Sequence, residues 1–379
     1  MAIMAADSMH APLRVQQLGP LYTNHVRRWA ELAATLGCTV YAAGHVSPGR
    51  RRVELADVAD GVEVAPEALY EAEPEAHVTW LRSVLDRLEP DLIQAHYLIR
   101  WPYVAALAGG PPLVATPWGS DVYLATGEAR DRADHALRQA DVVIAHSRHM
   151  RCELLDRGVA PERIHSADLG VDLNRFSPAP APADGGRPVI LSFRAGTELY
   201  NLDVVLDAFS LVRRRRPEAT LILVHGDAPL ADSVRARLDQ SEPGAVQICG
   251  HVRHAEMADH MRGATVGVSV PRSDGSPSSV WEALASGLPL VLSNLPQLEE
   301  RLGESGGAVF VEPRAESVAA ALIEVLEQPE RRRRMAMDAR AWAESHMDER
   351  RQVARLREIY ARFAGRDKAT PDGLPLRPS

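Results

Sequence analysis

Short apolar runs alternate along the chain with longer segments in which apolar residues recur at helical spacing. In the first half this pattern predicts a helix from about Asn24 to Leu36. It predicts strands at Arg14–Leu18, Thr39–Ala43, Leu92–Ala95, Pro112–Thr116 and Val142–His146. Strands separated by helices in this way are typical of a parallel sheet covered by helices.

The alternation stops at the Pro- and Ala-rich segment Phe176–Pro188, which we interpret as a semi-rigid linker. It resumes with a helix predicted at Asn201–Arg215, and a long helical segment is expected from about Pro329 to Phe363. The strands predicted in this second half are Val189–Phe193, Thr220–His225, Val246–Cys249, Thr265–Val270 and Leu288–Leu292. Two α/β halves are therefore expected, and the cleft between two such halves is a common place for a ligand.

Composition narrows the classes of function. The 379 residues include 43 lysines and arginines against 51 acidic residues, and the net charge of −8 argues against a general nucleic-acid or anionic-membrane binder. Only Lys368 is a lysine, which excludes a Walker lysine or a Schiff-base lysine from the folded body. Cys38, Cys152 and Cys249 form no C-x-x-C pair, and we find neither a signal peptide nor an apolar run long enough for a transmembrane helix. We therefore expect a reduced, soluble, cytoplasmic protein.

Motifs of several enzyme classes are missing from the sequence. No G-x-G-x-x-G follows the first predicted strand, so a dinucleotide oxidoreductase is disfavoured. The sequence also lacks a G-x-S-x-G elbow, an H-E-x-x-H zinc motif and a closely spaced Asp pair. We therefore expect no metal site and no bound cofactor.

The most informative segment is 273–289, a Gly- and Ser-rich loop that enters a predicted helix near Pro277. Backbone N–H groups at such a helix start, with serine hydroxyls beside them, suit a phosphate or diphosphate. Asp274 and Glu282 lie in the loop and about one turn into the helix, where carboxylates can accept hydrogen bonds from the vicinal hydroxyls of a sugar. A capped helix with a solvated glutamate is the alternative interpretation.

Two further segments follow predicted strands of the second half. Arg194 stands at a strand end beside a Gly-containing loop, where its guanidinium can bind two phosphate oxygens; a surface arginine is the alternative. The turn Gly250–Val252 can offer backbone groups to a nucleobase; an ordinary structural turn is the alternative.

Taken in order, these segments resemble glycosyltransferase family 4, the retaining nucleotide-sugar transferases of the GT-B fold. Asp274, seven residues, Glu282 and the following Ala-Leu-Ala-Ser-Gly-Leu-Pro match the family's motif, with Asp in place of the commoner first Glu. The stretches Asp168–Pro178, Ala140–Ser147 and His25–Gly37 resemble family segments of the first half. The resemblance covers nearly the whole chain and implies two Rossmann-like parallel-sheet domains that face each other across a cleft.

The resemblance also implies a division of labour between the domains. Residues 1–180 are expected to form an acceptor domain and residues 188–345 a nucleotide-sugar donor domain. A C-terminal helix at 346–365 is expected to return to the first domain, and residues 366–379 to form a disordered tail.

On the donor side, the resemblance implies that Glu282 holds the ribose hydroxyls and that Arg194 neutralises the donor diphosphate. Tyr200 stands where the family has a lysine, so backbone amides, Arg253 or Arg272 are expected to supply the remaining charge compensation. The candidate donor-binding residues are Gly19, Arg194, Tyr200, Gly250, His251, Val252, Asp274, Gly275, Ser276, Pro277, Ser278, Ser279 and Glu282.

In the first half, the family match points to His96 as a residue that faces the reacting sugar; a packing histidine is the alternative. Gly19, in a Leu-Gly-Pro loop, can let the donor phosphates approach closely. The candidate catalytic residues are His96, Arg194 and Asp274. The candidate acceptor-side residues are His25, Tyr97, Trp118, Ser120 and Asp121.

The sequence therefore predicts metal-independent, retaining transfer of a hexosyl or amino-hexosyl unit from a nucleoside-diphosphate sugar to an acceptor hydroxyl. UDP is the favoured nucleotide, and a small natural product such as an aminocyclitol the favoured acceptor. A polysaccharide or lipid-linked acceptor, a nucleotide-sugar epimerase, and a catalytically silent sugar-nucleotide-binding subunit are the alternatives. No nucleic-acid partner is expected, and the oligomeric state is left open.

Overall fold

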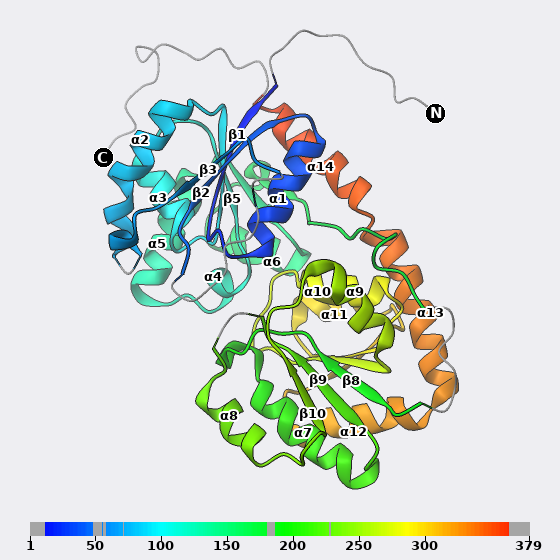
Figure 1. Ribbon diagram of the computed structural model, residues 1–379. Helices are drawn as coiled ribbons and strands as arrows, with labels where there is room; N and C mark the ends of the chain where they lie inside the picture. The colour runs from blue at the N-terminus through cyan, green and yellow to red at the C-terminus, as the bar shows by residue number, and fades with distance from the viewer. Residues whose placement is uncertain are drawn as a thin grey trace.

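The computed structural model has two α/β domains, which lie one above the other in Figure 1. It describes residues 12–47, 55, 58–70, 72–179, 186–226 and 229–363. Part of the predicted linker, at 180–185, and the predicted tail at 366–379 lie outside the described residues. None of the helices in the described ranges combines the length and apolarity that crossing a membrane would need.

Within the described residues, the first domain contains a seven-stranded parallel sheet with strand order β3-β2-β1-β4-β5-β6-β7. Its strands are β1 (Arg14–Leu18), β2 (Thr39–Gly44), β3 (Gly61–Val64), β4 (Leu92–His96), β5 (Leu113–Thr116), β6 (Val142–Ala145) and β7 (Ile164–Ser166). The edge strands β3 and β7 are additions to the strands that the sequence pattern predicts.

The second domain has a parallel sheet of order β10-β9-β8-β11-β12-β13, again counting only the described residues. Its strands are β8 (Val189–Ser192), β9 (Thr220–Val224), β10 (Val246–Cys249), β11 (Val266–Ser269), β12 (Leu290–Ser293) and β13 (Ala308–Val311). Here the edge strand β13 is the addition. The expectation of two Rossmann-like parallel-sheet domains is confirmed.

Helices connect most of the strands. In the first domain they are α1 (Asn24–Thr35), α2 (Val78–Leu88), α3 (Trp101–Ala108), α4 (Ser120–Tyr123), α5 (Gly127–Gln139) and α6 (Arg148–Asp156). From the second domain onward they are α7 (Leu202–Arg215), α8 (Asp232–Asp239), α9 (His254–Gly263), α10 (Ser278–Ala285), α11 (Pro296–Leu302), α12 (Ala315–Glu327), α13 (Pro329–His346) and α14 (Glu349–Ala361). Short 3₁₀ helices lie at Glu67–Leu69, Pro74–His77, Pro161–Arg163 and Glu198–Tyr200.

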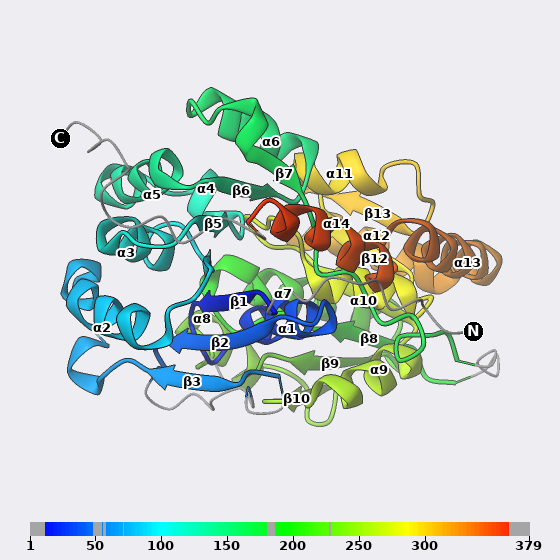
Figure 2. The same cartoon turned by 90° about the horizontal axis from the view of Figure 1, so that it is seen from above.

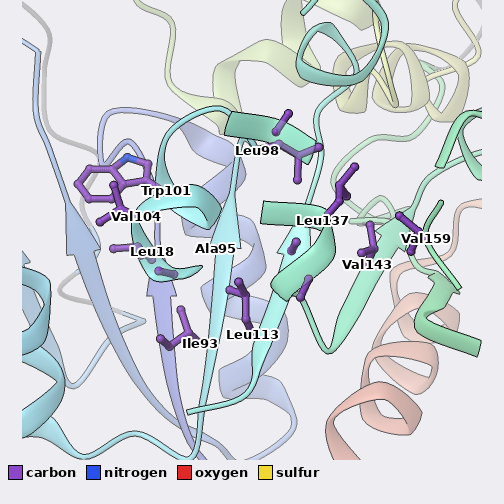
Figure 3. Packing of buried hydrophobic residues seen from close by; sticks show 14 of the residues in the cluster. Leu18, Ile93, Ala95, Leu98, Trp101, Val104, Leu113, Leu137, Val143 and Val159 are labelled. Carbon is purple, nitrogen blue, oxygen red and sulfur yellow. The ribbon is translucent and has the colours of Figure 1, made fainter. Parts of the chain in front are cut away.

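The strands are nearly continuous apolar runs because helices cover both faces of each sheet. Every residue of β6 and β12 is buried. In the first domain, α2, α3 and α5 pack on one face around the buried Trp101, as Figure 3 shows in part. Helices α1 and α14 cover the other face, an arrangement visible from above in Figure 2.

The long helical segment predicted from Pro329 to Phe363 is two helices in the structure. The break falls at Asp348, whose carboxylate accepts the backbone N–H of the second residue of α14 at 2.9 Å and so caps that helix. After the break the chain leaves α13 on the second domain and runs along α1 of the first, as Figure 1 shows. There the hydroxyl of Tyr360 is buried and lies 3.2 Å from the Gln17 side chain of β1.

The strand order places the candidate residues at facing edges of the two sheets. In each sheet the order reverses beside the first strand of the domain, between β1 and β4 and between β8 and β11. Ligands of such sheets bind in the crevice outside the carboxyl ends of the strands at this point. The loop at Gly19, the segment after His96, the loop at Arg194 and the loop at Ser273 all follow these four strands.

Candidate active site

A cavity of about 360 Å³ lies between the two domains. Its wall combines α1 and the loops after β5, β6 and β7 with the loops after β8, β9, β10 and β11. Most of the candidate residues border it, namely His25, Trp118, Ser120, Arg194, Tyr200, His251, Val252, Asp274, Ser276, Pro277, Ser278, Ser279 and Glu282. Those that do not border it are Gly19, His96, Tyr97, Asp121, Gly250 and Gly275.

Arg194 is fixed at the N-terminal end of α10. One of its terminal nitrogens donates to the Ser279 hydroxyl at 3.0 Å, and the other pairs with the Asp274 carboxylate. Its guanidinium carbon lies 4.4 Å from the centre of the Tyr200 ring. Tyr200 thus contributes a flat face that orients the guanidinium, not a second charge. The result is a buried, aimed cation beside a helix N-terminus, the kind of place where a diphosphate binds.

Glu282 is held in place from two directions. His254 of α9 and Arg28 of α1 both contact its Oε1 atom, at 2.8 and 3.1 Å. Neither contact involves Oε2. Arg28 also pairs with Glu349 of α14 at 3.0 Å, so this arginine joins both domains and the returning helix. A carboxylate fixed in this way at the cavity wall can accept hydrogen bonds from a pair of hydroxyls.

The loop 273–277, which we call the donor loop, touches the first domain at two points. The Asp168 carboxylate accepts the Ser276 hydroxyl at 2.7 Å and pairs with Arg301 of α11 at 2.8 Å. Next to it, the backbone of Gly119 packs directly on the backbone of Gly275. These contacts explain why Gly275 is absent from the cavity wall: the first domain covers it.

Gly19, which follows β1, and His96 of β4 are buried and do not border the cavity. A side chain at Gly19 would meet Val26 and His96, so that the neighbourhood of its α-carbon is already filled. His96 is fully buried, with Nε2 2.9 Å from the Gln17 amide oxygen and Nδ1 without a hydrogen-bond partner. Burial, and then the charges of His25 and His146, lower the pKa of His96 to about 3, so the ring is neutral near pH 7.

Asp121 and Tyr97 shape the acceptor side from behind. The buried Asp121 carboxylate accepts the backbone N–H groups of Leu98, Trp118 and Gly119 at 2.7–2.9 Å, and so fixes both loops. Tyr97 adopts a φ of 69°, a left-handed conformation that is uncommon for an aromatic residue and is often found near functional sites.

His25 and Trp118 form the aromatic part of the wall, with ring centres 4.5 Å apart. Burial, and then the charge of Arg194, lower the pKa of His25 to about 4. Its ring is therefore neutral near pH 7 and serves as a hydrogen-bonding surface, not as a cation.

Arg253 and Arg272 are not part of the site. Arg253 is largely exposed and pairs with Glu256, and Arg272 pairs with Glu198; neither borders the cavity. The turn that precedes Arg253 does contribute, because His251 and Val252 line the wall next to Gly250. No group of three or more His, Cys, Asp or Glu side chains in the described part of the chain is arranged to hold a metal ion.

Several residues of the site were missed by sequence reasoning. Arg28 sits within an ordinary amphipathic helix pattern, and Asp168 and His146 belong to segments that we used only as family landmarks. His254 had a usable signal, because it follows the Gly250–Val252 turn at the start of a helix.

Replacing Gly119 by alanine is expected to lower kcat/KM by about tenfold. A 1 Å misplacement of reacting groups can cost ~10²-fold, and a displaced donor loop should cost less than that. Its φ is +108°, and an added Cβ would lie 2.4 Å from the backbone nitrogen of Gly275, so the donor loop must move away. Gly110→Ala is the matched control, because its φ is +107° and its Cβ would meet only Leu85 at 3.7 Å. Equal losses in the two variants would mean that backbone strain, not the contact between domains, is responsible.

Two family models match consecutive parts of the chain. The model described as Glycosyltransferase Family 4 matches residues 23–175, and the model described as Glycosyl transferases group 1 matches residues 174–342. A GDP-mannose-dependent alpha-(1-6)-phosphatidylinositol monomannoside mannosyltransferase of Mycolicibacterium smegmatis is 26% identical over 275 residues, which cover 68% of this chain and 72% of that protein. A D-inositol 3-phosphate glycosyltransferase of Kineococcus radiotolerans is 29% identical over 296 residues, or 66% of each chain.

Solved structures share the fold across both domains. HepE of Anabaena, in complex with UDP and glucose, has a TM-score of 0.76 at 18% identity and covers 92% of this chain and 100% of its own. The sucrose-phosphate synthase of Thermosynechococcus elongatus has a TM-score of 0.75 at 17% identity, with 93% and 99% covered.

Proposed function

The chain belongs to glycosyltransferase family 4, and on that premise we propose that it transfers a hexosyl or amino-hexosyl unit from a nucleoside-diphosphate sugar to an acceptor hydroxyl, with retention at the anomeric carbon. The observation that carries the proposal is that Arg194, the first turn of α10 and Glu282 line one cavity. Ser279 of that turn accepts a hydrogen bond from Arg194, and Glu282 follows it by three residues in the same helix.

We assign the donor to the second domain and the acceptor to the first. The diphosphate would lie against Arg194 and the start of α10, with the ribose hydroxyls on Glu282. The acceptor would enter beside His25 and Trp118. The donor sugar would then lie between the two, against the donor loop.

In the proposed reaction the acceptor oxygen bonds to the anomeric carbon as the bond from that carbon to the diphosphate oxygen breaks. The diphosphate leaves with the electron pair of that bond, and one of its oxygens takes the acceptor's proton on the same face of the sugar. Arg194 and the α10 amides stabilise the charge that develops; one such preorganised donor is commonly worth ~3–4 kcal/mol. Neither a covalent nucleophile nor a metal ion is needed in this scheme.

Support for UDP and for a small cyclitol acceptor comes from the names of similar proteins. The HepE structure holds UDP, and the Kineococcus relative is named for D-inositol 3-phosphate. The Mycolicibacterium relative is named for GDP-mannose, so the nucleotide needs a direct test.

The expected result of a binding panel with UDP, GDP, ADP and dTDP is that UDP raises the melting temperature most. With UDP-sugars and cyclitol or aminocyclitol acceptors, mass spectrometry should then detect a glycosylated product, and the rate should be the same with EDTA as without it. Strict dependence on added Mg²⁺ would contradict the charge role given to Arg194. Conversion of the nucleotide sugar without an acceptor would indicate an epimerase, and binding without turnover a silent subunit.

A further inference from the structure

His146 follows β6, lines the cavity, and contacts backbone carbonyl oxygens with both ring nitrogens. Its Nδ1 atom lies 2.9 Å from the carbonyl oxygen of Ala167, and its Nε2 atom lies 2.9 Å from that of Pro117. A carbonyl oxygen can only accept a hydrogen bond, and a neutral imidazole carries only one N–H. Both contacts are satisfied together only when the ring carries two protons and a positive charge.

We propose that protonated His146 joins the two loops of the first domain that close over the donor loop, and that donor binding therefore requires a proton on this ring. His146 acts here as a positioning residue, through residues 117–119 and 167–168. The inference rests on the proposed function, because it treats the cavity as the site of a nucleotide-sugar donor.

The two loops are the ones that touch the donor loop. Pro117 precedes Gly119, whose backbone packs on Gly275, and Ala167 precedes Asp168, which binds the Ser276 hydroxyl. The His146 ring lies between the two loops and holds a carbonyl group of each.

The second domain also reaches His146 itself. Arg301 of α11 donates to the backbone carbonyl of His146 at 2.9 Å, and the same nitrogen of Arg301 pairs with Asp168. One histidine is thus tied to every first-domain contact of the donor loop described above.

Titratable and charged groups of several elements face the His146 ring. Asp168 after β7 and Asp274 of the donor loop face it with their carboxyl groups, and Arg301 of α11 faces it as a cation. Burial raises the pKa of Asp274 above its ordinary value, although the charge of Arg194 opposes that shift. Although burial would raise the pKa of Asp168, the charges of Arg301 and His146 lower it below its ordinary value. His25 of α1 and His96 of β4 also face the ring, and both are neutral near pH 7 because their pKa values are lowered. The centre of the Trp29 ring lies 6.5 Å from that of the His146 ring.

The sign of the pH effect follows from the two contacts. The arrangement in which both loops contact the donor loop holds the protonated ring. If the ring is neutral before these contacts form, their formation takes up one proton. As the pH rises and the proton leaves, a neutral ring can keep one carbonyl contact and must release the other. Donor affinity should therefore fall with rising pH, by roughly tenfold, the size expected for one lost charge-assisted hydrogen bond.

The test is calorimetric titration of the full chain with UDP-glucose between about pH 6 and pH 9. The diphosphate diester of this probe does not itself titrate in that range. We expect the wild type to bind roughly tenfold more tightly at the lower pH, with proton uptake, and His146→Gln to bind weakly and without pH dependence. His260→Gln, a change at a half-buried position of α9 outside the cavity wall, is the control and should keep the wild-type profile. A wild-type pH profile in His146→Gln would overturn the proposal.

A second measurement does not depend on the donor, and it reads the protonation of the ring in the wild-type protein. Nitrogen-15 NMR of the wild-type protein near neutral pH should show the His146 ring with both nitrogens protonated, and the signals lost in His146→Gln assign that ring. A neutral His146 ring would overturn the proposal even if UDP-glucose binds. If no nucleotide sugar binds but the ring is doubly protonated, the donor function fails and the proton assignment stands.

Discussion

Replacing Arg194 by alanine is expected to reduce kcat by roughly 10²–10³-fold, the loss typical of removing one preorganised charge-stabilising donor. Donor KM should change far less, because the charge on the diphosphate oxygen develops as the glycosidic bond breaks. Arg194 carries this role because the family lysine is replaced by Tyr200, and Arg253 and Arg272 lie outside the cavity. Steady-state kinetics with a fixed acceptor and varied nucleotide sugar separates the two parameters.

The controls for Arg194 must separate chemistry from folding. Removing this arginine leaves the buried Asp274 carboxylate without its partner, a change that can destabilise a protein by about 3–5 kcal/mol. The double variant Arg194→Met, Asp274→Asn removes both charges and should melt closer to the wild type, yet remain as slow as Arg194→Ala. Arg194→Lys should recover part of the rate, because it restores the charge but not the two-pronged contact with Ser279 and Asp274. A wild-type kcat in either charge-removing variant would exclude Arg194 from the reaction.

Much of the fold could be predicted from the sequence because buried parallel strands are short apolar runs that helical segments separate. The strands near Arg14, Leu92 and Val189 lie within a residue or so of the predicted positions. The edge strands β3 and β13 escaped prediction because their residues are only partly buried, so the apolar signal is weak. The hydrophobic spacing alone did not mark the helix break at Asp348, because the segment keeps helical spacing on both sides. A separate C-terminal helix from residue 346 was expected only from the family resemblance.

The candidate site was predictable where one short segment carries its chemistry, as in the donor loop and at Arg194. It was not predictable where a residue acts through a partner far along the chain. Arg28 and Glu282 are 254 positions apart, and Asp168 and Ser276 are 108 apart. No local pattern marks such pairs, because the contact exists only after the two domains have docked. Gly19 and His96 show the opposite case: their sequence segments match the family, but neither residue borders the cavity.

The near absence of lysine can be related to the ion pairs at the junction of the two domains. Each arginine at the junction of the domains is matched to a carboxylate: Arg194 to Asp274, Arg28 to Glu282, and Arg301 to Asp168. Planar guanidinium groups suit such fixed pairs better than flexible ammonium groups do. The site is therefore organised before a donor arrives, and an incoming diphosphate meets an arginine whose orientation is already set.

Replacing Glu282 by alanine is expected to weaken nucleotide binding by about 10²-fold, since two hydrogen bonds to a charged group are lost at roughly 1.5 kcal/mol each. The carboxylate is held by His254 and Arg28, so it needs no reorientation to receive the ribose. Because the ribose takes no part in bond breaking, kcat at saturating donor should fall much less than affinity. Calorimetric titration with UDP measures the effect.

The specificity of that loss is the sharper test of Glu282. If its carboxylate binds the ribose hydroxyls, wild-type protein should prefer UDP to 2′-deoxy-UDP, and Glu282→Ala should bind the two nearly equally. Glu349→Gln removes another acidic partner of Arg28 without touching the cavity wall, and it should keep the preference. A preference lost in Glu349→Gln as well would mean that Arg28, by holding the domains together, controls nucleotide binding. Unchanged affinity in Glu282→Ala would remove this residue from the site. If the variant binds both nucleotides more weakly but still prefers UDP to 2′-deoxy-UDP, Glu282 acts only at the junction of the domains.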